Sequence, residues 1–276
     1  MPLKYFYTTE LNKTISESSL PEDAVLQLKE TVHYIATVCR VKVGDPIALV
    51  CQKSQCAYRA KIKSINKQAI CVQLQSVEAV HNACWPQIML AAAVIKETHW
   101  HWLLQKATEL GITEIQPVLS ERVMVQVSLQ DVEKKRKRWQ AVVQSAAEQS
   151  ESLVLPMVKQ PVYFDAFLNN EENLDSVNKT KMHYCFLHER GDNRIPWNQY
   201  IQEQFAQKVE HPVRVMLAIG PEGGWSDSEA LQFREKGFLP VALGSKILRA
   251  DTASCVAVSA LTLALNQPHC LSIPKP

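Results

Sequence analysis

The chain has 276 residues, of which 46% are hydrophobic and 21% charged, and its formal net charge at pH 7 is only +2. These values are typical of a soluble globular protein, and the length permits one large domain or two modest ones, each with a buried core. The longest apolar run, IMLAAAVI, is too short to span a membrane. Because the net charge is small, a nucleic-acid partner would have to meet a local basic patch.

The N-terminus and the cysteines predict a cytoplasmic protein. The first residues, MPLKYFYTTE, contain no apolar region of the kind found in signal peptides. The cysteines are scattered and never form a C-x-x-C pair, so we expect reduced thiols and no metal site. The eight cysteines are Cys39, Cys51, Cys56, Cys71, Cys84, Cys185, Cys255 and Cys270.

The first third of the chain is predicted to be a small β-rich barrel of roughly seventy residues. Two short helical patterns come first, and short β-branched runs separated by turn-forming residues follow them. The expected helices cover residues 21–30 and 31–40, the expected strands 46–51, 56–65 and 69–77, and the expected turns 43–45 and 66–68.

Basic residues outnumber acidic ones in the strand region of this barrel. They are Lys42, Lys53, Arg59, Lys61, Lys63 and Lys67. Charge alone supports two interpretations equally, namely a solvated face of the barrel or a surface that contacts nucleic acid.

From Trp85 onward the pattern is that of a parallel α/β domain. Residues 85–95 form a continuous apolar run, as expected of a strand that is buried on both faces. Residues 98–111 carry apolar side chains at helical spacing and end in Gly111, a natural C-terminal cap, and residues 112–120 indicate the next strand. A strand, a helix and a strand in this order are typical of a βαβ unit.

The remaining segments continue this alternation. A long helix is predicted over residues 131–149. Its basic stretch KKRKR is either a solvated helix face or a surface that binds the phosphates of a nucleic acid. A polar run predicts a surface loop at residues 169–181. Further strands are expected at residues 183–189, 213–220 and 240–244, and a C-terminal helix is expected at residues 251–267.

Three of these strands end in polar or glycine-containing loops, FLHERG, AIGPEGG and LGSKILR. Ligands of open parallel sheets bind at the carboxyl ends of strands, so the three loops are expected to share one pocket. Ser226 and Glu229 predict a capping box on the helix after the GPEGG loop. That loop matches neither common phosphate-binding motif, and Glu222 would repel a phosphate, so a ligand with a neutral or positive portion is favoured.

The histidines and Arg249 can each be interpreted as structural or as functional residues. His99 and His101 are two residues apart and face different ways on a helix, so they are interpreted as surface or packing residues. His188 stands at a strand end and is expected to line the pocket, mainly through its backbone. Arg249 is either a structural ion-pair partner, of Asp251 or Glu222, or a group that acts on a substrate.

Four ordered segments together carry a family resemblance. KATELGITEIQPVLSERV, AAEQS, AIGPEGGWSDSE and LGSKILRADTA resemble the RsmE family, the ribosomal RNA small-subunit methyltransferases of the SPOUT class. The resemblance implies an α/β fold with a small N-terminal PUA-like, RNA-binding β-barrel at residues 1–74 and a C-terminal SPOUT methyltransferase domain at residues 75–276. It also implies a parallel sheet and a trefoil knot, a rare feature among folds, at about residues 183–265.

The resemblance further implies S-adenosyl-L-methionine as the cofactor. The bare glycine backbone of the GPEGG loop would let the cofactor lie against it, and the sulfonium makes an acid there tolerable. The residues implied to contact the cofactor are Leu187, His188, Gly220, Pro221, Glu222, Gly223, Gly224, Leu243, Gly244, Ile247, Leu248 and Arg249.

The implied activity is methylation of N3 of a uridine in 16S rRNA of the small ribosomal subunit, by a homodimer. Arg249 is the expected catalytic residue, because it could stabilise charge on the uracil carbonyl oxygens, and Glu222 is the candidate base. Two alternatives remain: an RNA-binding factor with this fold that lacks turnover, and a methyltransferase for a different RNA site. The residues expected to contact RNA are Arg40, Lys42, Lys61, Lys63, Lys96, Arg122, Arg136 and Arg138.

The chain departs from the pattern of this family in three places. After EQS the family usually has Gly-Arg, whereas this chain has Glu151 and Ser152. In the last segment Lys246 stands where the family usually has arginine, and Ala250 and Asp251 stand where it usually has Thr-Glu. A lysine keeps the charge of an arginine but lacks its planar fork of donors.

Overall fold

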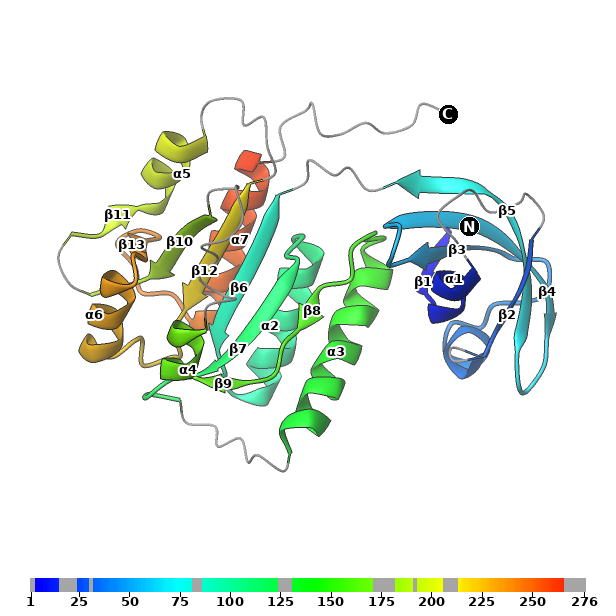
Figure 1. The fold of residues 1–276 in the computed structure, drawn as a ribbon, viewed down its shortest axis with the longest axis horizontal. Helices are drawn as coiled ribbons and strands as arrows, with labels where there is room; N and C mark the ends of the chain where they lie inside the picture. The colour runs from blue at the N-terminus through cyan, green and yellow to red at the C-terminus, as the bar shows by residue number, and fades with distance from the viewer. Residues whose placement is uncertain are drawn as a thin grey trace. The chain divides into compact units, whose positions relative to one another are not determined.

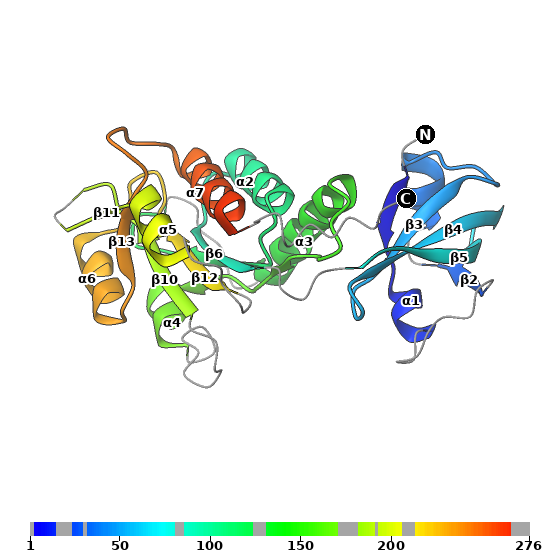
Figure 2. The ribbon, with the colours of Figure 1, turned by 90° about the horizontal axis from the view of Figure 1, so that it is seen from above.

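The structure, a computed structural model, describes residues 3–14, 24–29, 32–80, 86–123, 131–170, 182–190, 193–205 and 213–265. The chain divides into two compact units (Figures 1 and 2). The first unit comprises Met1–His81 with Ala147–Leu155, and the second comprises Asn82–Ala146 with Pro156–Ile273. Among the described residues, no helix is long and apolar enough to cross a lipid bilayer.

The first unit is built on a five-stranded sheet in the order β1-β3-β4-β5-β2. β1 runs parallel to β3, and the other strand pairs are antiparallel. Its elements are β1 (Lys4–Tyr7), α1 (Thr9–Thr14), β2 (Val25–Leu28), a π-helical turn (Tyr34–Val38), β3 (Pro46–Cys51), β4 (Cys56–Ile65) and β5 (Ile70–Val80). The three strands expected between residues 46 and 77 are therefore confirmed.

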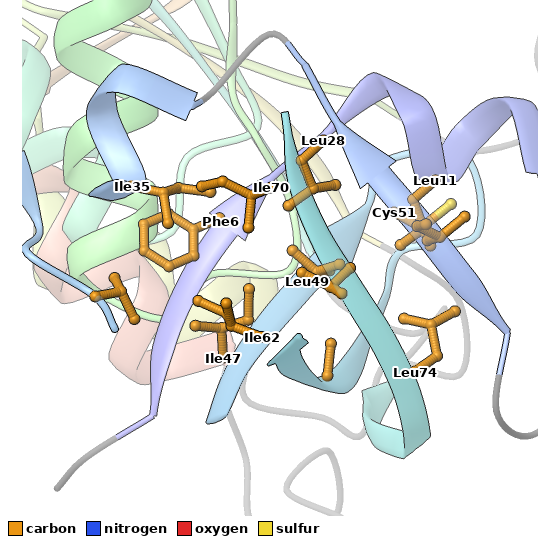
Figure 3. Packing of buried hydrophobic residues seen from close by; sticks show 14 residues of the cluster. Phe6, Leu11, Leu28, Ile35, Ile47, Leu49, Cys51, Ile62, Ile70 and Leu74 are labelled. Carbon is orange, nitrogen blue, oxygen red and sulfur yellow. The ribbon is translucent and has the colours of Figure 1, made fainter. Parts of the chain in front are cut away.

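The alternation of side chains along β4 separates the core of this unit from its surface. The buried positions are Ala57, Ala60 and Ile62, and the exposed positions are Arg59, Lys61 and Lys63. Figure 3 shows the apolar side chains Phe6, Leu28, Leu49 and Ile62, from four different strands, inside this core. Because successive strand residues point to opposite faces, burying the apolar set places the basic row in solvent.

The prediction of a helix over residues 21–30 is wrong. Val25–Leu28 forms β2, which pairs antiparallel with β5 from Val25 opposite Gln73 to Leu28 opposite Ile70. Leu26 and Leu28 are buried whereas Val25 is exposed, so the segment has the two-residue period of a strand. Pairing with an available sheet edge outweighs the weak helical preference of a short segment. The second expected helix is present in part, as helical turns over residues 32–38.

The segment Ala147–Leu155 packs on the sheet of the first unit. The side chain of Ala147 lies in a buried cluster with Tyr7, Ala48 and Val50. The hydroxyl of Tyr7 donates to the carbonyl oxygen of Ser152 at 2.6 Å, and the Tyr7 N–H donates to a carboxylate oxygen of Glu148 at 3.2 Å. Burial raises the pKa of the Tyr7 hydroxyl, so this donor keeps its proton.

The second unit contains an eight-stranded parallel sheet, as the βαβ pattern predicted. Its main path has the order β11-β13-β10-β12-β6-β7-β8, and β9 pairs with β7. All of its pairs are parallel. The strands are β6 (Gln87–Ala93), β7 (Glu114–Leu119), β8 (Met157–Val158), β9 (Val162–Tyr163), β10 (Met182–Leu187), β11 (Ile195–Pro196), β12 (Arg214–Ile219) and β13 (Leu239–Ala242).

Helices cover both faces of this sheet. They are α2 (Glu97–Glu109), α3 (Val132–Gln149), α4 (Phe164–Asn169), α5 (Trp197–Phe205), α6 (Asp227–Glu235) and α7 (Ala250–Leu265). α2 and α7 lie side by side on one face, whereas α4 and α6 pack on the other (Figure 2). The helices expected at residues 98–111, 131–149 and 251–267 are therefore confirmed, while the loop expected at 169–181 lies almost wholly outside the described residues.

The ends of two helices follow local chemistry that the sequence displays. α2 stops before Gly111, whose φ of +89° lies in the left-handed region that favours glycine. α6 begins with the predicted capping box, in which the Ser226 hydroxyl accepts from the Glu229 N–H at 3.1 Å and Glu229 accepts from the Ser226 N–H at 2.8 Å.

Phe233 of α6 is the centre of the aromatic core under the sheet. Its fully buried ring lies 4.8 Å, centroid to centroid, from Phe186 of β10 and 4.9 Å from both Trp225 and Phe238. Aromatic rings bury the largest apolar area of any side chains, so this cluster ties α6 and the loop before it to the sheet.

We expect Phe233→Ala to lower the free energy of unfolding of the second unit by about 3–5 kcal/mol, because it leaves a cavity that its neighbours fill only in part. Urea unfolding followed by tryptophan fluorescence measures this loss. Leu231→Ala is the matched control on the same helix, where an exposed leucine contributes within about 0.5 kcal/mol. Equal effects of the two substitutions would contradict the prediction.

Candidate active site

Three polar loops meet at the carboxyl edge of the parallel sheet. β10 lies between β12 and β13, and all three strands run in the same direction. The loops that follow them begin at His188, Gly220 and Leu243. The sequence predicted this meeting of loops from the strand ends alone, and it arises because parallel neighbours deliver their carboxyl ends to one edge.

Two adjoining hollows of about 120 and 230 Å³ lie among these loops. The smaller one is lined by the GPEGG loop, and the larger one by the loop after β13. The wall that the two hollows share consists of Leu187, His188, Glu189, Ile247, Leu248 and Ala253. They therefore form one continuous pocket lined by both apolar and polar residues.

The structure brings together every residue expected to contact the cofactor except Arg249. The GPEGG residues Gly220–Gly224 line the smaller hollow, and Leu243 and Gly244 line the larger one. The wall also contains residues that the sequence analysis did not assign to the pocket. These are Glu189, Arg190, Ile219, Trp225, Asp227, Ala250, Ala253, Arg194, Val241, Ala242, Ser245 and Lys246, with Arg122, which was expected to contact RNA instead.

The glycines of the GPEGG loop serve two different needs. A Cβ at Gly220 would lie 3.1 Å from the backbone nitrogen of Trp225, so what comes close there is the loop's own chain. Gly224 has a φ of +66°, which favours glycine, and its N–H donates to the Pro221 carbonyl at 2.8 Å to close a tight turn. Both glycines are therefore required by the backbone of the loop itself, independently of any ligand.

Arg122, from the loop after β7, is hydrogen-bonded to the GPEGG loop and lines the smaller hollow. Its guanidinium donates to the carbonyl oxygens of Gly223 at 3.0 Å and Trp225 at 3.2 Å. A Cβ at Gly223 would lie 3.4 Å from the Cβ of Arg122, so the stem of the arginine packs against that glycine. The motif SERV contained this arginine, but nothing in the sequence identified its partners.

Glu229 also connects the GPEGG segment to the loop after β7, but here the side chain comes from the start of α6 and reaches the loop after β7. Glu229 is only 3% exposed, and its carboxylate accepts from the N–H groups of Ser226 at 2.8 Å and Glu121 at 2.9 Å. We call the Arg122 and Glu229 side chains together the loop clasp. A buried carboxylate is tolerated when donors surround it, and here the backbone N–H groups of Ser226 and Glu121 supply one donor from each segment.

Two titratable groups of the pocket, His188 and Glu189, have pKa values shifted towards their neutral forms. Burial lowers the pKa of His188, and the positive charges of Arg234 and Arg194 lower it further. Burial raises the pKa of Glu189, against the opposing effects of Arg190 and a hydrogen bond from the Leu248 backbone. Desolvation disfavours the charged form of each group, so the pocket contains little fixed positive charge at His188 near pH 7.

Arg249 stands beside the pocket and is exposed. The residues that flank it, Leu248 and Ala250, line the smaller hollow, but Arg249 itself lines neither hollow. Across the described part of the chain, the guanidinium of Arg249 has no ion-pair partner. The carboxylate of Asp251, its expected partner, instead meets Nδ1 of His99 at 2.7 Å. The structural interpretation of Arg249 as a partner of Asp251 is therefore wrong.

Seven of the eight residues expected to contact RNA fall into three groups, and the eighth, Arg122, lines the pocket. Arg40, Lys42, Lys61 and Lys63 belong to the first unit and are exposed. Lys96 is the exposed residue immediately before α2, at the carboxyl end of β6. On α3, Arg136 pairs with Glu133 at 2.8 Å and Arg138 pairs with Glu97 at 2.6 Å, so both are partly neutralised by acids.

The contact between His99 and Asp251 predicts a pH dependence of stability. Burial alone would raise the pKa of Asp251, but hydrogen bonds from His99 and the Thr252 backbone lower it below its usual value. A carboxyl with a lowered folded pKa stabilises the fold above its unfolded pKa, and this stabilisation disappears as the pH falls through the folded value. Asp251→Asn should therefore cost more stability at about pH 6 than at about pH 3 in urea titrations. A cost that is the same at both pH values would contradict the prediction.

Comparisons with known proteins agree with this arrangement. The family described as an RNA methyltransferase domain matches residues 83–262, and the family described as an RNA methyltransferase PUA domain matches residues 29–75. Ribosomal RNA small subunit methyltransferase E of Synechocystis is 30% identical over 255 residues, which cover 91% of this chain and 77% of that protein. The protein of the same name from Bacillus subtilis is 26% identical and covers 84% of this chain and 87% of its own length.

Two solved structures are similar to the whole chain. A Legionella pneumophila protein solved with bound SAM has a TM-score of 0.77 and 28% identity, covering 96% of this chain and 98% of its own. Ribosomal RNA small subunit methyltransferase E from Neisseria gonorrhoeae, bound to S-adenosyl methionine, has a TM-score of 0.73 and 26% identity, covering 95% and 98%. With a matching family over most of the second unit and a 30% identical relative aligned over 91% of this chain and 77% of its own length, this chain belongs to the ribosomal RNA small subunit methyltransferase E family.

Proposed function

We propose that this protein is an S-adenosylmethionine-dependent methyltransferase that modifies N3 of a uridine in the 16S rRNA of the small ribosomal subunit. The observation that carries the proposal is the pocket at the ends of β10, β12 and β13, on a chain whose relatives of 26% and 28% identity were solved with this cofactor. The position on the base and the 16S target rest on the resemblance of the ordered motifs.

The donor set of the pocket fits this cofactor. S-adenosylmethionine carries a positive sulfonium and amino group together with an apolar adenine ring. The acids Glu222 and Asp227 border the smaller hollow, and the aliphatic side chains of Leu187, Ile219 and Leu248 form its wall. The lowered pKa of His188 keeps that imidazole neutral, so it does not repel a cation. When bound, the cofactor would supply an electrophilic methyl group.

The protein residues have two tasks in the reaction. They align the uracil nitrogen with the methyl carbon, so that a nitrogen–carbon bond forms as a sulfur–carbon bond breaks, which is chiefly a matter of positioning. They also handle the proton of N3 and the charge that its loss leaves on the carbonyl oxygens. Arg249, exposed at the pocket mouth, would stabilise that charge, and the exposed carboxylate of Glu222 would accept the proton.

The two units have separate parts in this proposal. We assign residues 1–74 to a PUA-like RNA-binding domain and residues 75–276 to a SPOUT methyltransferase domain. The exposed row Arg59, Lys61 and Lys63 supports RNA contact by the first unit, since phosphate contacts release counterions. RNA affinity should therefore fall steeply with salt. Action on the small ribosomal subunit implies a cytoplasmic location.

The finer architecture is also part of the proposal. A trefoil knot over about residues 183–265 is supported by the sheet order, in which β10 lies between the later strands β12 and β13. A homodimer is supported by α7, which exposes Val256 and a Leu263 that is 76% accessible. Small residues between them would let a partner helix approach closely. Light scattering that shows a monomer at micromolar concentration would contradict the dimer.

The test of the proposed function is methylation in vitro. Purified protein, labelled cofactor and small subunits or 16S rRNA from a strain lacking the gene should yield labelled RNA, and mapping should place the methyl group on N3 of one uridine. Calorimetry on the same protein should show that the cofactor binds. Binding without any transfer would support an RNA-binding factor that lacks turnover, and label at another nucleotide would support a different RNA site.

Arg249→Ala should lower the single-turnover rate of methylation by on the order of a hundredfold, as the loss of an oxyanion-type donor does. The affinity for the cofactor should change little, because Arg249 lines neither hollow. The melting temperature should also hold, because the side chain is exposed and makes no ion pair with the described residues. A normal single-turnover rate in the folded variant would remove Arg249 from the mechanism.

A further inference from the structure

We propose that Arg122 is a positioning residue for the cofactor pocket: through the loop clasp it holds the GPEGG loop in its binding shape. The inference rests on the proposed function, because it assigns the loop to cofactor binding. It differs from the role that the sequence suggested for Arg122, which was contact with RNA.

The clasp fixes whole peptide groups of the loop rather than single atoms. In the peptide between Gly223 and Gly224, the carbonyl accepts from Arg122, and the N–H donates to the Pro221 carbonyl. In the peptide between Trp225 and Ser226, the carbonyl accepts from Arg122, and the N–H donates to Glu229. A peptide plane that is held at both its donor and its acceptor cannot flip without breaking two hydrogen bonds.

A guanidinium suits this task because its donors lie in one rigid plane. One nitrogen, Nη1 of Arg122, reaches the carbonyl oxygens of both Gly223 and Trp225. The stem of the same side chain packs against Gly223, where a Cβ would already lie 3.4 Å from the Cβ of Arg122. A lysine ammonium also carries several donors, but it has no planar fork that presets their direction.

The clasp joins loops that the sheet itself does not join. Arg122 and Glu121 follow β7, whereas the GPEGG loop follows β12, and β6 lies between these two strands. The N–H of Glu121 is held by Glu229 from the start of α6, so each segment contributes one arm of the contact. Without the clasp, the loop would depend on its internal turn and on the packing of Trp225 in the aromatic core.

These carbonyl partners separate a positioning role from an RNA contact. Two neutral oxygens of the protein already accept from the guanidinium, and Arg122 lines the smaller hollow. Removing the side chain therefore leaves two loop carbonyls without their donor and lets the loop sample other shapes. The cost should appear in cofactor affinity, because binding must then restore the lost order.

The experiment compares wild type, Arg122→Ala, Arg122→Lys and the control Lys236→Ala, an exposed cation at the end of α6 outside the pocket. Calorimetry with S-adenosylmethionine should show affinity lowered by on the order of ten- to a hundredfold for Arg122→Ala, as expected for a lost charge-assisted contact. Arg122→Lys should recover part of the loss, and Lys236→Ala should bind as wild type does. Amide exchange at residues 220–226 should be faster in cofactor-free Arg122→Ala than in wild type.

RNA affinity, measured without cofactor, separates the two roles of Arg122. We expect it to be unchanged in Arg122→Ala. Unchanged cofactor affinity together with lowered RNA affinity would overturn the inference and return Arg122 to the RNA surface. If Arg122→Ala does not fold, wild-type cofactor affinity in Arg122→Lys would overturn it as well. Absence of cofactor binding in the wild type would instead refute the proposed function, and normal binding in both wild type and Arg122→Ala would refute the positioning role alone.

Discussion

The shape of the pocket depends on the buried carboxylate of Glu229, which accepts from the Glu121 N–H across 108 positions of sequence. The same carboxylate completes the capping box of α6. Without donors on both sides its burial would cost far more than one ordinary hydrogen bond contributes, so its partners must keep their places. The start of α6, the end of the GPEGG loop and the loop after β7 therefore form one rigid corner.

The order of the parallel sheet supplies the other walls around that corner. β10, β12 and β13 lie next to one another although long stretches of chain separate them, and their loops meet because their directions agree. The aromatic core around Phe233 anchors the loops from below, since Trp225 belongs both to that core and to the pocket lining. Core packing and pocket shape are thus coupled through one side chain.

Arginines near this edge are distinguished by their partners rather than by their sequence context. Arg122 donates to backbone carbonyl oxygens, Arg136 and Arg138 pair with acids on helices, and Arg249 makes no ion pair with the described residues. An arginine held by neutral carbonyls keeps its full charge but loses its freedom to move, whereas one without such partners keeps both. This difference separates a residue that shapes a site from one that can respond to charge developing on a substrate.

The sequence by itself determined the parallel sheet, the capping box at Ser226 and Glu229, and the meeting of three loops at one pocket, because periodicity, caps and strand direction are local signals. It misassigned residues 21–30 as a helix, since the edge of β5 that Val25–Leu28 joins is formed by residues far along the chain. Only the tertiary structure decided that Asp251 meets His99 and that Arg122 meets Gly223 and Trp225. Those contacts join segments about a hundred residues or more apart, and no periodicity encodes which distant donor a buried acceptor will find.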